Sequence, residues 1–198
     1  MIGFEYPSEP HCRRHGPAGY TDYASYRDWL RDEFLFRCVY CLHREQWYSR
    51  CGTFHIDHFV PLTIKPGGVC EYSNLVYSCA TCNEAKREIL VPDPCSVALH
   101  DCLRVMSDGR VEALNQDGAR LILVLRLDSV SNVRYRSLLI RTLDALRVTA
   151  PSVYKEYLRF PDDLPDLRTK QAPQNTKPEA VADCFFARRE RGQLPLTY

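Results

Sequence analysis

The stretch from 53 to 86 reads TFHIDHFVPLTIKPGGVCEYSNLVYSCATCNEAK, and it decides the fold of this chain. Apolar and polar side chains alternate over 53–60, which predicts a strand. A loop containing Pro and Gly at 66–68 follows it. Residues 74–78 predict a second strand, and residues 83–90 predict a helix. The order strand, loop, strand, helix indicates an α+β core.

The segments on either side of this stretch predict more helix than strand. Thr21 or Asp22 can cap a helix that runs from 23 to about 36, with its apolar residues mostly on one face. Residues 119–127 fit a helix or a strand, 134–148 predict a helix and 154–160 a last short helix. We divide the chain into an N-terminal arm and helix at 1–36, a core at 37–91, a mostly helical C-terminal part at 92–160, and a Pro-rich, irregular and weakly packed tail at 161–198.

The charge balance of the chain is close to neutral. Its 198 residues carry 26 Lys and Arg against 25 Asp and Glu, a formal net charge of +1. A protein that coats nucleic acid without specificity is far more basic, so this balance argues against that class but allows a local cluster of phosphate contacts. The N-terminus lacks the features of a secretory signal, and no apolar run is long enough to span a bilayer. We expect a cytoplasmic, soluble protein without a membrane partner.

Ten cysteines are many for a protein of a reducing compartment, and four of them form two Cys-x-x-Cys pairs. Each pair can present two thiolates to one ion, so Cys38, Cys41, Cys79 and Cys82 predict a zinc site. Four thiolates leave no open coordination position, which makes this zinc structural. The alternative is four buried or redox-active cysteines. The spacing assigns no role to the others: Cys12, Cys51, Cys70, Cys95, Cys102 and Cys184.

Two histidines and a carboxylate lie within four residues of the first strand. Alternation along a strand puts His55 and Asp57 on one face and His58 on the other, unless a bulge re-aims one of them. Taken alone, Asp57 and His58 favour a hydrogen-bonded structural pair at a sheet edge. The motif around them favours a reactive centre instead.

That motif consists of Asp57-His58-x-x-Pro61, Gly67-Gly68, Asn74-Leu75 and Cys79-x-x-Cys82-Asn83-x-x-Lys86, with Cys38-x-x-Cys41 upstream. It resembles the HNH endonuclease superfamily, whose ββα-metal motif has these elements in this order. The resemblance is dense from about 37 to 90. Elsewhere the chain is more weakly similar to stand-alone bacterial HNH proteins. The resemblance implies an α+β fold in which an N-terminal helix and a mostly helical C-terminal part flank a ββα-metal core.

The resemblance also implies roles in hydrolysing a phosphodiester bond. His58 is the implied general base, which takes a proton from the attacking water. Asp57 and Asn83 are the implied ligands of one divalent cation, Mg²⁺ or Mn²⁺, because both offer oxygen donors. Asn74 is expected to brace the loop and so orient His58. His55 is a possible further ligand, and an exposed structural histidine fits it equally well.

Basic residues near the motif predict the contacts to phosphate. Lys86 and Arg87 lie on the motif helix and, together with Arg37, are expected to bind the nucleic-acid backbone. Arg44 and Arg50 are interpreted as solvated surface charges.

We therefore expect a metal-dependent endonuclease that cuts DNA and leaves a 5′ phosphate and a 3′ hydroxyl. The near-neutral charge suggests that a protein partner supplies targeting. A role in antiviral defence, or in a phage or mobile element, is analogy with the superfamily alone. Two alternatives stay open: a zinc-stapled module that binds nucleic acid or a partner with little catalysis, and a nuclease that cuts RNA.

Overall fold

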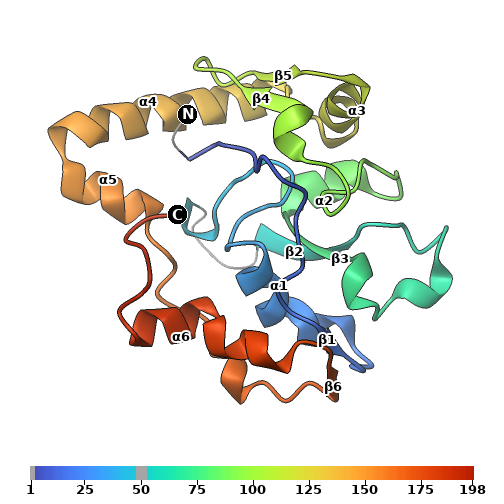
Figure 1. The fold of residues 1–198 in the computed structure, drawn as a ribbon. Helices are drawn as coiled ribbons and strands as arrows, with labels where there is room; N and C mark the ends of the chain where they lie inside the picture. The colour runs from blue at the N-terminus through green and yellow to red at the C-terminus, as the bar shows by residue number, and fades with distance from the viewer. Residues whose placement is uncertain (1–2, 48–52) are drawn as a thin grey trace.

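A two-stranded antiparallel sheet followed at once by a short helix forms the centre of the structure (Figure 1). The computed structural model describes residues 3–47 and 53–198. Strand β2 (Phe54–His58) pairs with β3 (Leu75–Cys79), and helix α2 (Ala80–Lys86) begins at the next residue. The strand, loop, strand, helix order is present as predicted. The helix begins three residues earlier than its spacing predicts, because the last residue of β3 keeps an extended backbone and serves as the N-cap.

The N-terminal helix is shorter than its apolar spacing predicts. The Asp22 side chain accepts a hydrogen bond from a backbone N–H of the first turn and so caps η1 (Tyr23–Tyr26), which continues into α1 (Arg27–Glu33). The helix ends there because Leu35 and Phe36 adopt the left-handed backbone conformation, with φ of 57° and 53°. Helix α1 packs against β3.

A hairpin and three helices lie on the side of the central sheet away from α6 (Figure 1). Strands β4 (Leu103–Val105) and β5 (Val111–Ala113) pair antiparallel, and no alternation in the sequence is long enough to predict them. The segment that fits a helix or a strand is a helix, α3 (Gln116–Leu125). Helices α4 (Val130–Thr149) and α5 (Pro151–Leu158) follow, each beginning a few residues before its predicted start.

The last segment of the chain is folded and packed, so the expectation of an irregular, weakly packed tail over 161–198 is wrong. Strand β6 (Gln174–Asn175) pairs antiparallel with β1 (Pro17–Ala18), and α6 (Phe185–Glu190) lies close to the C-terminus. The backbone N–H of Phe185 donates to the Asp32 carboxylate at 2.8 Å. These contacts join residues far apart in the sequence, which local composition cannot predict. Buried side chains of this segment are Leu164, Leu167, Cys184 and Phe185.

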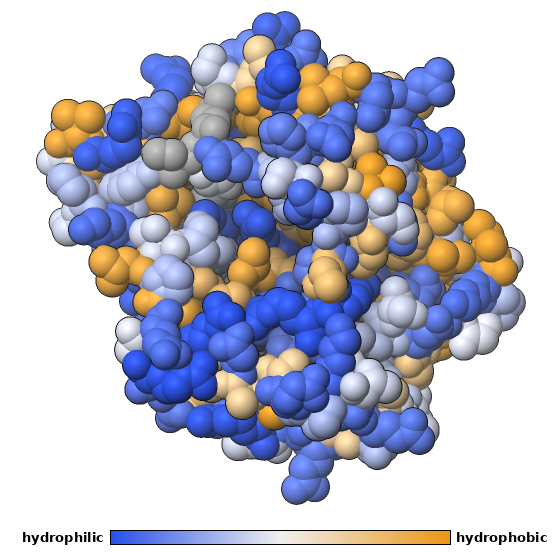
Figure 2. Space-filling model, in the orientation of Figure 1, coloured by the Kyte–Doolittle hydropathy of each residue, from blue (hydrophilic) through white to orange (hydrophobic). Residues whose placement is uncertain are grey.

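The larger of two hydrophobic clusters among the described residues runs from Phe4 in the N-terminal arm to Ala187 in α6, and the smaller one contains Phe36, Phe160, Leu164 and Phe185. Helices and small sheets together confirm the α+β class. Figure 2 shows a largely hydrophilic outer face over α6, whose last turn is basic. Within residues 3–47 and 53–198, no helix has the length and apolar character needed to cross a bilayer. Short 3-10 helices complete the structure at Glu45–Trp47, Pro66–Gly68, Tyr72–Asn74, Leu99–Asp101, Leu167–Thr169 and Pro178–Asp183.

Arg44 is buried, and its interpretation as a solvated charge is wrong. Its guanidinium donates to the Leu158 carbonyl at 2.9 Å and lies 4.1 Å from the centre of the Tyr198 ring. Burial lowers the pKa of Arg44 to about 10. Arg50, interpreted in the same way, and Cys51 lie outside the described residues.

A buried polar cluster ties the N-terminal arm to α1. The Glu33 carboxylate accepts hydrogen bonds from His11 Nε2 at 2.9 Å, the Arg14 N–H at 2.6 Å, the His15 N–H at 3.0 Å and the Tyr72 hydroxyl at 2.9 Å. Burial by itself would raise the pKa of Glu33, but these hydrogen bonds outweigh burial and lower its pKa to about 2. The ionised carboxylate is therefore the form that the fold favours.

We expect Glu33→Gln to lose a contribution to stability that depends on pH. Folding lowers the pKa of Glu33 from 4.5 to about 2, so its ionised form stabilises the fold by about 3 kcal/mol at neutral pH. This contribution is fully present above the unfolded pKa and disappears as pH falls through the folded pKa. Urea unfolding should show a gap between wild type and Glu33→Gln that narrows steadily below about pH 4.5. Glu156→Gln, on the exposed face of α5, should match wild type throughout, and a gap that stays constant with pH would contradict this prediction.

Candidate functional site

Four cysteine sulfurs converge where the hairpin meets α2. Cys38 and Cys41 lie in the turn before β2, Cys79 ends β3 and Cys82 lies in the first turn of α2. All four residues are buried, and their sulfur atoms lie within 4.8 Å of one another. The Cys41 and Cys79 sulfurs are 3.6 Å apart, close to the ~3.8 Å that two thiolates of a tetrahedral zinc site span. The two predicted pairs thus form one cluster that can hold a metal ion.

A tight backbone turn presents the first pair of sulfurs. The Cys38 N–H donates to the His43 carbonyl at 2.8 Å, and the Leu42 N–H donates to the Cys38 carbonyl at 3.0 Å. Leu42 closes this turn with a φ of 63°. Hydrogen bonds from Cys38 and Cys41, above other contacts, lower the pKa of Cys79. The cluster therefore favours a thiolate at Cys79, and thiolate is the form of cysteine that binds metals.

The Asp57 carboxylate is buried between the cysteine turn and α2. Tyr40, which lies between the two cysteines of the turn, donates its hydroxyl to Oδ2 at 2.9 Å. Lys86 donates its ammonium to Oδ1 at 3.0 Å, and its side chain is fully buried. Burial raises the pKa of Asp57, and the ion pair with Lys86 opposes that rise. Each carboxylate oxygen accepts one of these two hydrogen bonds, which leaves the group about two further lone-pair sites.

The His58 imidazole is half-buried at the edge of this ion pair. Its Nε2 lies 2.9 Å from the Val69 carbonyl oxygen. A carbonyl oxygen can only accept a hydrogen bond, so Nε2 carries the hydrogen and, in the neutral ring, Nδ1 keeps a lone pair. The Tyr23 ring meets the imidazole edge-on with centroids 5.2 Å apart. These contacts fix the ring with one basic nitrogen available.

Asn74 fastens the segment after β2 to the start of β3. Its Oδ1 accepts from the Val60 N–H at 2.8 Å, and its Nδ2 donates to the Val60 carbonyl at 3.1 Å. Its backbone carbonyl accepts from the Phe59 N–H at 2.8 Å. A Cβ at Gly68 would lie only 3.0 Å from the Asn74 amide nitrogen, so glycine leaves room for this side chain. The contacts hold the loop whose Val69 carbonyl orients the histidine.

Asn83 and His55 differ in how the fold places them. Asn83 is half-buried and lies three residues before Lys86 on α2, so both side chains point towards the same side of the helix. His55 is exposed, whereas Asp57 on the same strand is buried beneath Tyr40 and Lys86. Strand alternation puts both residues on one face and so predicts equal burial for them, which the structure does not show. Among the contacts of the described residues, no hydrogen bond joins His55 to Asp57.

The structure contradicts part of the predicted phosphate-binding set. Lys86 is paired with Asp57 in the interior and cannot reach a phosphate. Arg37 lines a pocket to which no residue of β2, β3 or α2 contributes, and its contact with phosphate stays a prediction. Arg87 is exposed directly after α2 and remains available.

Two tyrosines contact the side chains of this site in ways that the sequence pattern does not predict. Tyr40 holds the Asp57 carboxylate, and Tyr23 supports the His58 ring. Tyr40 carries a signal that reasoning from sequence can use, because it lies inside the first cysteine pair and the metal site brings that pair to the hairpin. Tyr23 begins η1, which Asp22 caps, but no local signal in the sequence places its ring against His58.

Residues 38–88 match the sequence model of the HNH endonuclease family. This part of the chain is an HNH endonuclease domain. The matched residues include both cysteine pairs, the β2–β3 hairpin and α2. The HNH domain implies a role in cutting nucleic acid. No curated protein matches the chain.

We expect loss of Lys86 to destabilise the HNH domain strongly. Lys86→Met removes one partner of a buried ion pair and leaves the Asp57 carboxylate uncompensated, which costs about 3–5 kcal/mol. Urea unfolding at neutral pH measures this loss. Lys65→Met is the matched control, because it breaks an exposed pair with Glu71 and should cost less than about 1 kcal/mol. Equal losses in the two variants would show that the buried pair gives no special support.

Proposed function

We propose that the HNH domain is a metal-dependent endonuclease that hydrolyses DNA phosphodiester bonds, with His58 as general base. The observation that carries this proposal is the hydrogen bond from Nε2 to the Val69 carbonyl, since it leaves Nδ1 as the basic nitrogen of a half-buried ring. A water about 3 Å from Nδ1 would give its proton to His58 as its oxygen attacks the phosphorus. Asn74 supports this role by holding the loop that orients the ring.

Asp57 and Asn83 are the residues that would hold a catalytic Mg²⁺ or Mn²⁺. Both offer the oxygen donors that these hard cations prefer, and Asp57 keeps acceptor capacity beyond its bonds to Tyr40 and Lys86. When bound, such a cation neutralises negative charge on the scissile phosphate and on the leaving 3′ oxygen. His55 is a candidate for a further ligand, which its exposure permits.

Arg87 is the basic residue that best suits a phosphate contact beside this site, because it is exposed at the end of the helix that carries Asn83. A net charge of +1 gives the chain little long-range attraction for a polyanion. We therefore propose that a protein partner supplies targeting. RNA offers the same phosphodiester chemistry and is the alternative substrate.

One contact favours a second function, in which the domain binds nucleic acid or a partner with little catalysis. Lys86 places an ammonium 3.0 Å from Asp57 Oδ1, and a divalent cation on the same carboxylate would be repelled by that charge. Cleavage assays separate the two functions, because the binding module should not cut.

The metal of the four-cysteine cluster is proposed to be zinc in a structural role. Four sulfur donors suit zinc, and they fill its tetrahedral coordination so that no position is left for water. This ion would therefore hold the fold, and the catalytic cation would be a separate, exchangeable ion at Asp57 and Asn83.

We expect purified protein to contain one zinc per chain, measured by atomic emission. Cys41→Ser should lose the metal together with cooperative unfolding, because the binding free energy of such a site is folding free energy. Cys12→Ser, at an exposed cysteine outside the cluster, should keep both. A zinc-free protein with an unchanged circular dichroism spectrum would refute the structural role.

We expect His58→Ala to slow metal-dependent nicking of supercoiled plasmid by about 100-fold or more, because general base catalysis contributes about that much. EDTA should stop the wild-type reaction. His100→Ala is the matched control, since this histidine is exposed on the 3-10 helix Leu99–Asp101, outside the HNH domain, and should leave the rate unchanged. His55→Ala should raise the Mg²⁺ concentration needed for half-maximal cleavage if His55 is a ligand.

Three outcomes of this assay decide between the alternatives. Cleavage by His58→Ala at the wild-type rate would show that another group is the base. Faster cleavage of RNA than of DNA of the same sequence would identify the substrate as RNA. Failure of the wild-type protein to cut either one in Mg²⁺ or Mn²⁺ would favour the binding module.

A further inference from the structure

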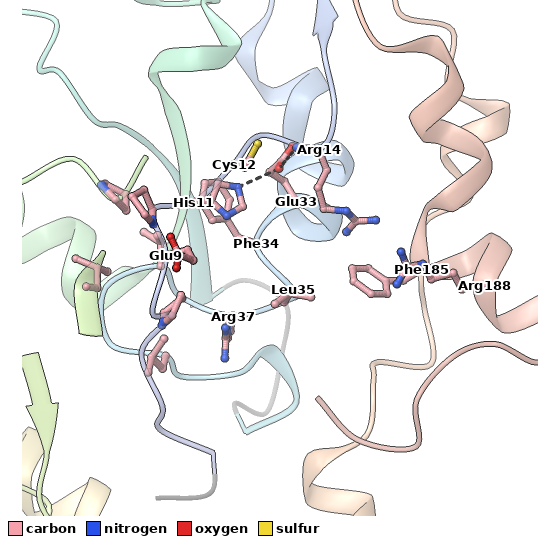
Figure 3. Close-up of a pocket in the computed structure, with 16 residues that line it drawn as sticks. Glu9, His11, Cys12, Arg14, Glu33, Phe34, Leu35, Arg37, Phe185 and Arg188 are labelled. Atoms are coloured by element: carbon pink, nitrogen blue, oxygen red, sulfur yellow. Dashed lines mark hydrogen bonds and ion pairs between the residues drawn. The ribbon is translucent and has the colours of Figure 1, made fainter. Parts of the chain in front are cut away.

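A pocket lies where the N-terminal arm, the end of α1 and α6 meet (Figure 3). Its volume is about 460 Å³, which falls within the roughly 300–1,000 Å³ of small-molecule sites. Its walls come from segments far apart in the chain, and none of them belongs to β2, β3 or α2. The pocket is therefore separate from the site at His58.

The walls of this pocket are mostly apolar. Phe34 and Leu35 contribute from the end of α1, Val39 and Leu42 from the cysteine turn, and Phe185 from α6. Figure 3 shows Phe185 pointing from α6 towards Leu35 across the space between them. Aromatic and aliphatic walls of this kind suit a flat apolar group.

Arg37 differs from the other charged residues of the pocket because no carboxylate of the described residues forms an ion pair with it. Residues 1–2 and 48–52, which lie outside the described ranges, contain no Asp or Glu that could supply one. The side chain is half-buried, and burial lowers the pKa of Arg37 because water is removed from its guanidinium. Figure 3 shows Arg37 among the residues that line the pocket.

The other charged residues of the pocket are paired or solvated. Glu33 accepts a hydrogen bond from His11 at 2.9 Å. Arg14 and Arg188 each pair with an aspartate that lies outside the pocket lining. Glu9 is exposed, so water screens its charge. The pocket thus presents one positive charge that is not compensated by an ion pair within the protein.

We propose that this pocket binds a small ligand with a flat, apolar body and one acid group, a carboxylate or a phosphate, that pairs with Arg37. The apolar walls hold the body of the ligand. The guanidinium can donate two parallel N–H groups to two oxygens of either acid. Partial burial strengthens this pairing, because the effective dielectric constant is lower there than in water.

Titration calorimetry of the full chain, purified with its metal and without added Mg²⁺, tests the proposal with four probes. Benzoate and phenyl phosphate carry both an aromatic ring and an acid, phenol lacks the acid, and inorganic phosphate lacks the ring. We expect at least one of the two aromatic acids to bind at least about tenfold more tightly than phenol and inorganic phosphate, because an aromatic acid uses both the walls and Arg37 and each of the other probes uses one of them. The tighter of the two identifies the acid group.

Arg37→Met keeps the length of the side chain and removes its charge. It should weaken binding of the better acid by about 10- to 100-fold and leave the affinity for phenol unchanged. Arg141→Met, at an exposed arginine of α4, is the matched control and should bind as wild type does.

The proposal is overturned if neither aromatic acid binds more tightly than phenol, or if Arg37→Met binds the better acid as tightly as wild type. Circular dichroism checks that the variant is folded. If Arg37→Met does not fold, Arg37→Lys decides, because it keeps the charge but loses the paired donors. It must weaken binding of the better acid by at least about threefold, and unchanged binding overturns the proposal.

Discussion

Convergence of four cysteine sulfurs at one point is the constraint on which the HNH domain depends. One pair comes from the turn before β2 and the other from the junction of β3 and α2, so the cluster joins the beginning of the motif to its end. Each strand has only five residues, and a two-stranded hairpin alone is at best marginally stable. The same turn carries Tyr40 to the Asp57 carboxylate, and the same helix carries Lys86 to it. The environment of Asp57 is therefore set by the elements that the cysteines bring together.

Two of the buried carboxylates, Glu33 and Asp57, differ in how many hydrogen bonds they accept, and their pKa values shift in opposite directions. Glu33 accepts four hydrogen bonds, three from the N-terminal arm and one from Tyr72, and its pKa is lowered in spite of burial. Asp57 accepts from Tyr40 and Lys86 alone among side chains, and burial raises its pKa. The charge on Asp57 is thus compensated less completely. Asp57 keeps acceptor sites for a further cation, whereas the Lys86 ammonium beside it opposes a divalent charge on the same carboxylate.

The sequence predicts the HNH core well, because its signals are local. Each signal lies within a few residues of the element that it predicts. These signals are the cysteine pairs, the alternation before Pro61 and the glycines of the loop. Other predictions failed where the structure depends on distant contacts. The burial of Arg44 needs Leu158 and Tyr198, and the packing of the last segment needs Asp32 and β1. The prediction that Lys86 contacts phosphate failed because its position in the helix does not show that the Asp57 carboxylate lies opposite it.

The cysteine turn also connects the two sites of this protein. Val39 lines the pocket of Arg37, and the next residue, Tyr40, holds Asp57. A ligand in the pocket can affect the site at His58 only if the turn has two conformations and the ligand binds the protein with different affinity in each of them. The turn is fixed by the bond from Cys38 to His43, by the bond from Val39 to Tyr77 at 3.0 Å and by its own cysteines, so a second position would require breaking several contacts at once. Occupancy of the pocket should therefore stabilise the turn in its present position and, with it, the contact between Tyr40 and Asp57. On this geometry, the proposed ligand would act on the HNH domain through its stability.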